Sequence, residues 1–363
     1  MRSSTFRAVI LALLAAALVL PAALAGAQQS GPQQQPPPPK QEQKQEQKKS
    51  DTEQYTLSVE VPLVSVDVVV TDNRGNFVSN LSKENFRVLE DGVPQTITNF
   101  SPTDAPITMV MLIEFSKLFW EISSYTSTAM GQYFLPNLKK DDWIALMTYD
   151  LKPRIEVDFT RNKNEVAQYL SRMYFPGFSE ANLFDAIHDV VDRLKDVKGK
   201  KSVLILGTGL DTFSRKTLDD TIKLLRQTDV TFFCVGAARA IFEYLDARGA
   251  YNGAWGGAAR TSYYQAENQL RTFAEMTGGR AWFPRFQGEW PGIFADVAAS
   301  LRNQYSLVYA PKNQKRDGKF RKIKVELVAP DGGPLTVLDE KGKKVKVVIY
   351  AREGYLAPRA VGD

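Results

Sequence analysis

Three acidic side chains follow apolar runs of the kind that form buried strands, and together they could hold a divalent cation. Glu114 ends the run ITMVMLIE, Asp150 ends WIALMTYD, and Asp211 follows KSVLILGT by a short loop. Ligands in open sheets of parallel strands bind beyond the carboxyl ends of the strands, where these carboxylates would meet. A hard cation such as Mg²⁺ takes oxygen ligands of this kind. The alternative for Asp150 and Asp211 is an ordinary role in loops or at helix ends.

The residues that common catalytic mechanisms require are sparse. His188 is the only histidine, and it lies in LFDAIHDVVDRL beside an apolar helical face, where a half-exposed structural residue is expected rather than a general base. No Gly-x-Ser-x-Gly elbow, His–Cys pair or phosphate-loop motif is present, and GTGLDT lacks the spacing of a dinucleotide motif. We therefore predict a protein that is not an enzyme, with an unrecognised hydrolase as the catalytic alternative. The apolar face beside His188 consists of Leu183, Ile187, Val190, Val191 and Leu194.

The elements that would position the carboxylates lie between residues 106 and 303. The runs ITMVMLIE, WIALMTYD, KSVLILGT and VTFFCVGA are nearly continuous in apolar residues, as in parallel strands covered on both faces. Helical patterns separate them, in NEVAQYLSRMY, ANLFDAIHDVVDRLKDV, KTLDDTIKLLRQT and QAENQLRTFAEMT. Strands that alternate with helices predict an α/β domain with a doubly wound, mostly parallel sheet.

Segments of a different pattern flank this region. Residues 55–105 alternate apolar and polar side chains in TLSVEVPLVSVDVVVTD and then form two short strands around Asp91-Gly92. Residues 304–357 repeat the period of two in NQYSLVYAP, FRKIKVELVAP and KVKVVIYAREGY, with lysines on alternate positions that indicate a solvated face. We expect the two segments to pair as one antiparallel β-sandwich-like domain. The α/β domain would be inserted in it or packed beside it, and residues 358–363 would form a tail.

The first 27 residues have the pattern of a secretory signal peptide. Arg2 and Arg7 accompany the apolar run VILALLAAALVLPAAL, and Ala25-Gly26-Ala27 offers a small-residue cleavage site. A membrane anchor is the alternative, but Pro21 interrupts a run already short for a hydrocarbon core of about 30 Å. We expect export to the periplasm, the cell envelope or the extracellular space, with membrane contact only through the signal peptide before cleavage.

Composition indicates a linker and argues against nucleic-acid binding and an internal disulfide. Residues 28–54 are rich in Gln, Pro and Lys and bury too little apolar surface to offset their ordering entropy, which predicts a disordered linker. A proline-rich ligand for another domain is the alternative. The formal net charge of +5 is too mild and too scattered to indicate nucleic-acid binding. The single cysteine, Cys234, excludes an internal disulfide and is expected to be a small core residue.

The order ITMVMLIEFS, SEANLFDAIHDVVDRL and KSVLILGTGLDTFS resembles the von Willebrand factor type A domain. The flanking VDVVVTDNRGNFVSNLSKENFRVLEDGVPQTITNF, SLRNQYSLVYAP and DGKFRKIKVEL are similar to the VWFA-related family of exported acidobacterial proteins. The resemblance covers roughly residues 57–357. It implies the α/β fold described above and a divalent metal bound by Asp-x-Ser-x-Ser after the first strand, a Thr in a second loop and an Asp after the fourth strand.

The residues at those positions match the family pattern poorly. The resemblance places the metal ligands at Glu114, Ser116, Leu118, Ala181 and Thr208. Only Ser116 is the family residue, because Glu114 is a methylene longer than Asp, and Leu118 and Ala181 carry no side-chain oxygen. Mg²⁺ requires near-octahedral oxygen ligands, so we expect no metal or other cofactor. Recruitment of Asp150 and Asp211 beside Glu114 is the alternative that would restore a site.

A long segment after VTFFCVGA predicts a recognition loop. Residues 237–265 separate this strand from the helix expected near Ala266, which is long for a connection in an α/β domain. Rigid aromatic side chains among glycines are typical of contact surfaces, although the rings could instead cover a neighbouring helix or the vestigial metal site. The candidate residues are Tyr251, Trp255, Tyr263, Tyr264, Arg239 and Arg248.

These patterns together predict an exported, non-catalytic module for protein binding or adhesion. It would bind an unidentified protein or a cell-envelope component through the loops at the carboxyl ends of the parallel strands, without a metal. Metal-dependent adhesion through Glu114, Asp150 and Asp211 is the first alternative. A purely structural envelope protein, with the α/β domain as a spacer, is the second.

Overall fold

The computed structural model describes residues 63–102, 106–173, 176–249, 254–338 and 341–359. The predicted signal peptide, the linker, residues 55–62 and most of the predicted tail therefore lie outside the described residues. No helix in the described ranges is long and apolar enough to cross a membrane.

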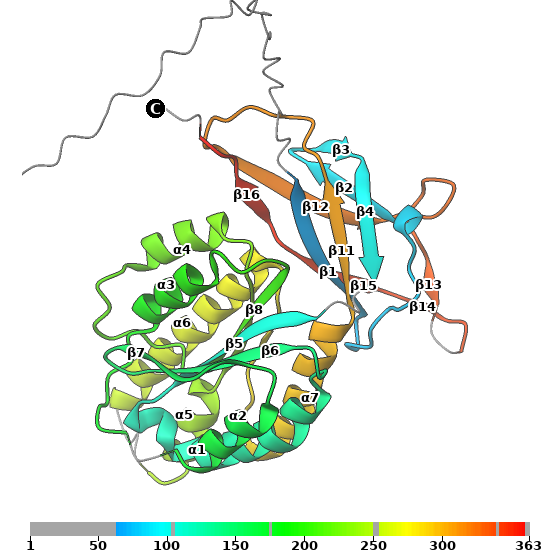
Figure 1. Ribbon diagram of the computed structural model, residues 1–363. Helices are drawn as coiled ribbons and strands as arrows, with labels where there is room; N and C mark the ends of the chain where they lie inside the picture. Colours follow the sequence, from blue (N-terminus) through cyan, green and yellow to red (C-terminus); the bar gives the residue numbers. More distant parts are fainter. Residues whose placement is uncertain (1–62, 103–105, 174–175, 250–253, 339–340, 360–363) are drawn as a thin grey trace, which may run out of the picture. The chain divides into compact units, whose positions relative to one another are not determined.

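The α/β region is built on a six-stranded sheet with the order β10-β9-β8-β5-β6-β7 (Figure 1). Neighbouring strands are parallel, except that β7 pairs antiparallel to β6. The four expected apolar runs form the central strands β5, β6, β8 and β9. The strand bounds are Ile107–Glu114 for β5, Trp143–Tyr149 for β6, Pro153–Thr160 for β7, Lys200–Gly207 for β8, Thr231–Gly236 for β9 and Ala281–Trp282 for β10.

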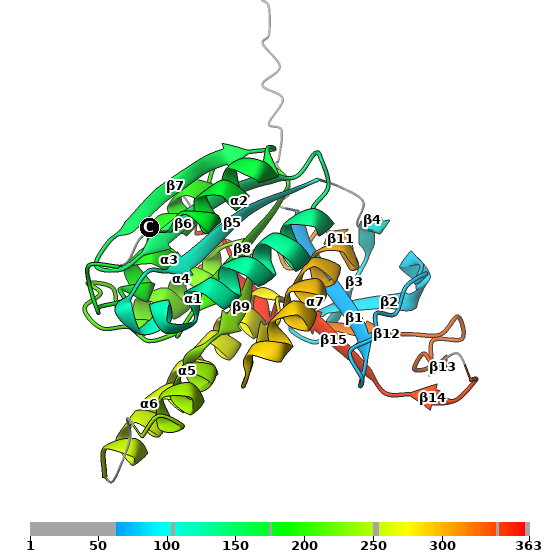
Figure 2. The same cartoon turned by 90° about the horizontal axis from the view of Figure 1, so that it is seen from below.

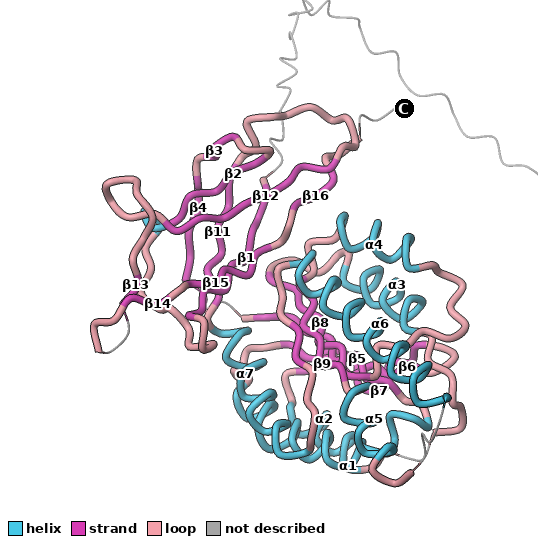
Figure 3. Tube along the Cα trace, turned by 180° about the vertical axis from the view of Figure 1, so that it is seen from behind, coloured by secondary structure: helices cyan, strands magenta, loops and turns pink. Residues whose placement is uncertain are grey.

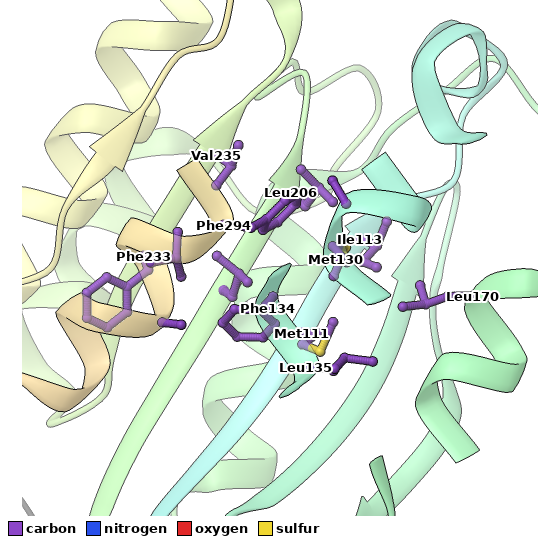
Figure 4. Close-up of a cluster of buried hydrophobic side chains, with 14 of the residues drawn as sticks. Met111, Ile113, Met130, Phe134, Leu135, Leu170, Leu206, Phe233, Val235 and Phe294 are labelled. Atoms are coloured by element: carbon purple, nitrogen blue, oxygen red, sulfur yellow. The ribbon is translucent and has the colours of Figure 1, made fainter. Parts of the chain in front are cut away.

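Helices cover both faces of this sheet, which is why its central strands are apolar almost throughout (Figure 3). Helices α1, α2, α5 and α7 pack on one face, where Met111, Phe233 and Phe294 belong to one buried cluster (Figure 4). Helices α3, α4 and α6 pack on the other face, and the buried Cys234 lies in that cluster. The helix bounds are Lys117–Ala129 for α1, Lys163–Ser171 for α2, Leu183–Leu194 for α3, Leu218–Gln227 for α4, Ala238–Asp246 for α5, Ala254–Thr277 for α6 and Trp290–Arg302 for α7; a π-helical turn, Met130–Phe134, continues α1.

The segments before and after the α/β region pair with each other, as the sequence predicts. β1 lies antiparallel to both β11 and β15 in a sheet with the order β15-β1-β11-β4, and β12 joins β2 in a second sheet with the order β16-β12-β2-β3. Alternate residues of β1 and β12 point into a shared apolar core, and Lys322 and Lys324 are exposed. The strand bounds are Val64–Asp72 for β1, Phe86–Glu90 for β2, Val93–Gln95 for β3, Ile97–Pro102 for β4, Gln304–Tyr309 for β11, Phe320–Leu327 for β12, Val337–Leu338 for β13, Lys344–Val345 for β14, Val347–Ala351 for β15 and Gly354–Leu356 for β16.

The prediction that residues 237–265 form a long loop is wrong, while their role in recognition stays a prediction. Helix α5 follows β9 directly, and α6 begins at Ala254 rather than near Ala266. In α5 the apolar residues Ala238, Ile241, Phe242 and Leu245 recur at the spacing of one helical face. The glycines and aromatic residues of the segment masked this periodicity, because in sequence they favour a loop. Figure 2 shows α5 and the first half of α6 side by side.

A buried carboxylate joins the two halves of the sandwich. Glu90 at the end of β2 is 2% exposed, and its Oε2 accepts hydrogen bonds from the hydroxyls of Tyr309 (2.8 Å) and Tyr355 (2.9 Å). Both tyrosines come from the segment that follows the α/β region. Burial, followed by the hydrogen bond to Glu90, raises the pKa of both phenols, so they remain donors to the carboxylate at neutral pH.

We expect Tyr309→Phe and Tyr355→Phe to be coupled. Each single change removes one donor and should lower the free energy of unfolding by about 1–2 kcal/mol. The double variant should lose more than the sum, because the buried Glu90 carboxylate then has no donor. Chemical denaturation of the four proteins measures the coupling, with Tyr350→Phe on β15 as a control. Additive losses would show that water replaces the phenols.

Candidate functional site

The Glu114 carboxylate lies at the carboxyl end of β5 and is fully engaged by donors of the protein. It is 1% exposed. Its Oε1 accepts a hydrogen bond from Ser116 Oγ at 2.5 Å. Its Oε2 accepts hydrogen bonds from the backbone N–H of Thr208 (2.6 Å), from Thr208 Oγ1 (2.7 Å) and from the Tyr149 hydroxyl (3.5 Å). Side chains from the ends of β5, β6 and β8 thus meet at one point, as expected for parallel neighbours.

The local backbone is shaped to leave room for this longer carboxylate. A Cβ on Gly207 would lie 2.6 Å from the Tyr149 hydroxyl and 2.7 Å from Glu114 Oε2, so only glycine fits at the end of β8. Burial raises the pKa of the Glu114 carboxyl, while the hydrogen bonds from Ser116 and Thr208 oppose the shift. Burial beside Glu114 also raises the pKa of Tyr149, which keeps its hydroxyl proton.

The other aligned positions serve the fold in the described structure. Ser116 is the N-cap of α1 and accepts a hydrogen bond from Phe119 N at 3.2 Å. Leu118 packs against Phe242 and Tyr263 in a small apolar cluster. Ala181 is buried, and its N–H donates to Thr212 Oγ1 at 3.0 Å.

The two acidic residues of the alternative metal site are engaged elsewhere. Asp150 Oδ1 accepts a hydrogen bond from Arg154 Nη1 at 2.7 Å and from Lys152 N at 3.1 Å. Asp211 Oδ1 accepts hydrogen bonds from Ser214 Oγ at 2.6 Å and from Phe184 N, in the first turn of α3, at 3.0 Å. These are the loop and helix-end roles considered in the sequence, and a carboxylate suits a helix N-terminus because of the helix dipole.

These side chains do not match the ligand set of a Mg²⁺-type ion. Such an ion needs several oxygen ligands in near-octahedral geometry, usually with carboxylate charge. Leu118 and Ala181 have no side-chain oxygen, and both oxygens of Glu114 already accept hydrogen bonds. Within the part of the chain that the structure describes, no three His, Cys, Asp or Glu residues are grouped closely enough to hold a metal ion.

The candidate residues of 237–265 were expected either to form a contact surface or to cover a neighbouring helix or the aligned metal site, and the structure places them differently from one another. Tyr263 is buried and packs against Phe242 with ring centroids 5.5 Å apart, in the cluster that Leu118 contacts at one of the aligned positions. Tyr264, the next residue of α6, is 48% exposed. Arg239 pairs with Glu243 on α5, and Arg248 stacks on Tyr244. Tyr251 lies outside the described residues, and the side chain of Trp255 is not among those described.

Two exposed aromatic residues on the loops at this end of the sheet were missed in the sequence. We call the loops after the carboxyl ends of β5, β6, β8 and β9, with the loop that precedes α3, the top face. Phe213 is 69% exposed and Phe178 is 47% exposed on this face. The carbonyl of Phe178 accepts a hydrogen bond from Lys117 N, and Phe213 N donates to Asn182 Oδ1. Phe213 stands among polar residues and Phe178 follows Pro176-Gly177, so neither belongs to a periodic pattern that would indicate its exposure.

Comparison with known protein families identifies the α/β region. The model of the von Willebrand factor type A domain matches residues 114–255, from the Glu114 carboxylate into the start of α6. These residues form a von Willebrand factor type A domain. Such domains are generally non-enzymatic modules for protein interaction and adhesion. No curated protein matches the sequence.

Solved structures of low sequence identity resemble the chain. The proximal thread matrix protein 1 of the mussel byssus is 11% identical, with a TM-score of 0.42 over 59% of this chain and 51% of its own. A von Willebrand factor type A protein from Catenulispora acidiphila is 10% identical, with a TM-score of 0.41 over 76% of this chain and 75% of its own. An aerotolerance-related membrane protein from Bacteroides fragilis is 9% identical, with a TM-score of 0.40 over 54% of this chain and 98% of its own. The chain thus spans about half the length of the mussel protein.

We predict that Glu114→Gln removes a pH-dependent loss of stability. The ordinary pKa of 4.5 applies to Glu114 in the unfolded chain, whereas burial raises it in the folded protein. Between the two values the folded protein binds more protons, so the free energy of unfolding falls as pH rises through this window. The free energy of unfolding of the natural protein minus that of Glu114→Gln should therefore decline with rising pH and then become constant.

Denaturant unfolding between about pH 4 and pH 8 measures this difference. The exposed Glu121→Gln on α1 is the control and should show no such trend. A difference for Glu114→Gln that is flat or rises with pH would contradict the assignment of a buried carboxylate.

Proposed function

We propose that the protein is an exported, non-catalytic binding module that recognises a protein or a cell-envelope component through the top face of its type A domain, without a metal. The single observation that carries this proposal is the Glu114 carboxylate. Its two oxygens accept four hydrogen bonds from Ser116, Tyr149 and Thr208, and these donors occupy the oxygens that would otherwise coordinate an ion. A binding mode in which an ion links this domain to a partner's carboxylate is then not available.

Exposed aromatic side chains offer a different means of recognition. Phe178 and Phe213 lie on top-face loops, and Tyr264 lies on α6, which packs against α5 after β9. Aromatic side chains are enriched at protein interfaces and dominate the energetics of such contacts. The loops that carry the two phenylalanines are fixed by hydrogen bonds to Lys117 and Asn182, so little ordering would accompany binding.

Export and family membership beyond the type A domain are part of the proposal. The signal-peptide pattern of residues 1–27 and the linker pattern of residues 28–54 support a module held away from its point of attachment in the periplasm, the envelope or outside the cell. The phrases of the flanking β segments support membership of the VWFA-related family of exported acidobacterial proteins.

The alternatives make different demands on the same residues. Metal-dependent adhesion would require Asp150 to leave Arg154 and Asp211 to leave the first turn of α3. A purely structural envelope protein would not need Phe178 and Phe213 at all. A hydrolase would need a base, and His188 lies on α3 away from the top-face network, with no partner for its Nε2 atom among the described residues.

Exchange of the exposed phenylalanines tests the binding surface. The immobilised chain should retain a partner from envelope extracts of its own organism in the presence of EDTA, and Phe178→Ser with Phe213→Ser should weaken retention at least about tenfold. Trp143→Ser is the matched control, because Trp143 is an exposed aromatic residue at the opposite end of the sheet. Retention that survives the double exchange would favour the structural alternative, and retention lost in EDTA would favour the metal-dependent one.

A metal titration tests the second part of the proposal. After treatment with EDTA, the thermal midpoint of the natural protein should not respond to millimolar Mg²⁺, Mn²⁺ or Ca²⁺. A variant with Glu114→Asp, Leu118→Ser, Ala181→Thr and Thr208→Asp should gain about 2.7 kcal/mol at a hundredfold excess of ion over the dissociation constant. Stabilisation of the natural protein that disappears in Asp150→Asn would overturn metal-independent binding.

A further inference from the structure

A polar cavity of about 380 Å³ lies at the junction of the β-sandwich and the type A domain. The type A domain contributes Lys200 and Lys201 at the start of β8 and Thr228 before β9. The sandwich contributes Asp67 on β1, Ser306 on β11 and Arg352 after β15. The cavity adjoins the amino end of β8, so it lies at the edge of the sheet opposite the Glu114 carboxylate.

Lys200 brings an unpaired cation to this cavity. Its Nζ atom is enclosed, and among the residues that the structure describes it has no hydrogen-bond partner. Burial lowers the pKa of this amine to about 8, partly opposed by the charge of Asp67. An enclosed ammonium group without a partner is unfavourable, which makes its side of the cavity attractive to an anion.

Arg352 adds a second cation, for which the described part of the chain supplies no carboxylate partner. Its Nη2 donates to the carbonyl of Thr228 at 3.1 Å, and its Nε donates to the carbonyl of Gly354 at 2.9 Å. These acceptors are neutral, so they orient the guanidinium group without cancelling its charge. Burial accordingly lowers the pKa of Arg352.

The nearby acidic groups compensate only part of this charge. Asp229 is paired with Lys201 at 2.8 Å, and Asp142 is paired with Arg302. Asp67 is therefore the one lining carboxylate of the described cavity that has no ion pair, and it opposes Lys200 and Arg352. The balance is positive, and the hydroxyls of Ser65 and Ser306, 3.4 Å apart, offer neutral donors beside it.

We propose that this cavity binds a small tetrahedral oxyanion of the phosphate or sulfate class, held by Lys200 and Arg352 and by serine hydroxyls of the sandwich. Charge-assisted hydrogen bonds from an ammonium and a guanidinium group are the strong contacts of such sites. Because Lys200 comes from the type A domain and Arg352 from the sandwich, the anion ties the two domains together. This site is independent of the top face, and either proposal can fail without the other.

Thermal unfolding of the full chain in inorganic phosphate tests the proposal, with sodium chloride of equal ionic strength as the baseline. At a phosphate concentration about a hundredfold above the dissociation constant, the midpoint should rise by several degrees. Lys200→Met should remove this rise, whereas Lys223→Met, which changes an exposed lysine on α4, should keep it. A rise that chloride reproduces, or that Lys200→Met retains, would overturn the site.

A second variant protects the test from a folding defect of Lys200→Met. Asp67→Asn removes the carboxylate that opposes the anion, so calorimetric titration with phosphate should show binding tightened about tenfold. Sulfate, which stays fully ionised near neutral pH, should follow the same order of variants. Binding that is unchanged or weaker in Asp67→Asn would contradict an anion held in this cavity.

Discussion

A carboxylate buried at the end of a central strand must find donors from other parts of the chain, and the top of this type A domain is organised around that requirement. Glu114 receives hydrogen bonds from Ser116 at the start of α1, from Tyr149 at the end of β6 and from Thr208 after β8. Gly207 leaves the space in which the carboxylate and the phenol meet. One side chain thus joins three strands and the first turn of a helix at the point where this fold places its ligands.

The hydrogen bonds to Glu114 also bear on whether this type A domain could bind a partner through a metal ion. Under the proposed function, the donors that satisfy Glu114 within the protein would leave it unable to share an ion with a partner. Leu118, which stands at an aligned ligand position, packs in the apolar cluster that contains Tyr263. What the surface retains is its shape, with Phe178 and Phe213 on loops that hydrogen bonds fix in place. In the proposed function, recognition by this face would depend on apolar contact rather than on coordination.

The insertion of one domain into the other gives the junction its own chemistry. The strands that flank the type A domain must return to pair with each other, and Tyr309 and Tyr355 close the sandwich on Glu90 of the first segment. Lys200 and Arg352 line the same cavity at this junction. The positively charged side chains of the cavity outnumber its carboxylates. Apolar burial therefore builds each domain, while polar groups line the cavity between them.

The sequence by itself determined the architecture, because periods of two and 3.6 residues record which face of an element is buried. It predicted the central parallel strands and the pairing of the flanking β segments, and it showed that Leu118 and Ala181 bring no oxygen to the aligned site. It missed α5 and the early start of α6, since glycines and aromatic residues hid their apolar face. Only the tertiary structure decided the partners of Glu114: Tyr149 and Thr208 are 35 and 94 residues away in the chain. Hydrogen bonds of this kind depend on distances between elements, which no local pattern of residues encodes.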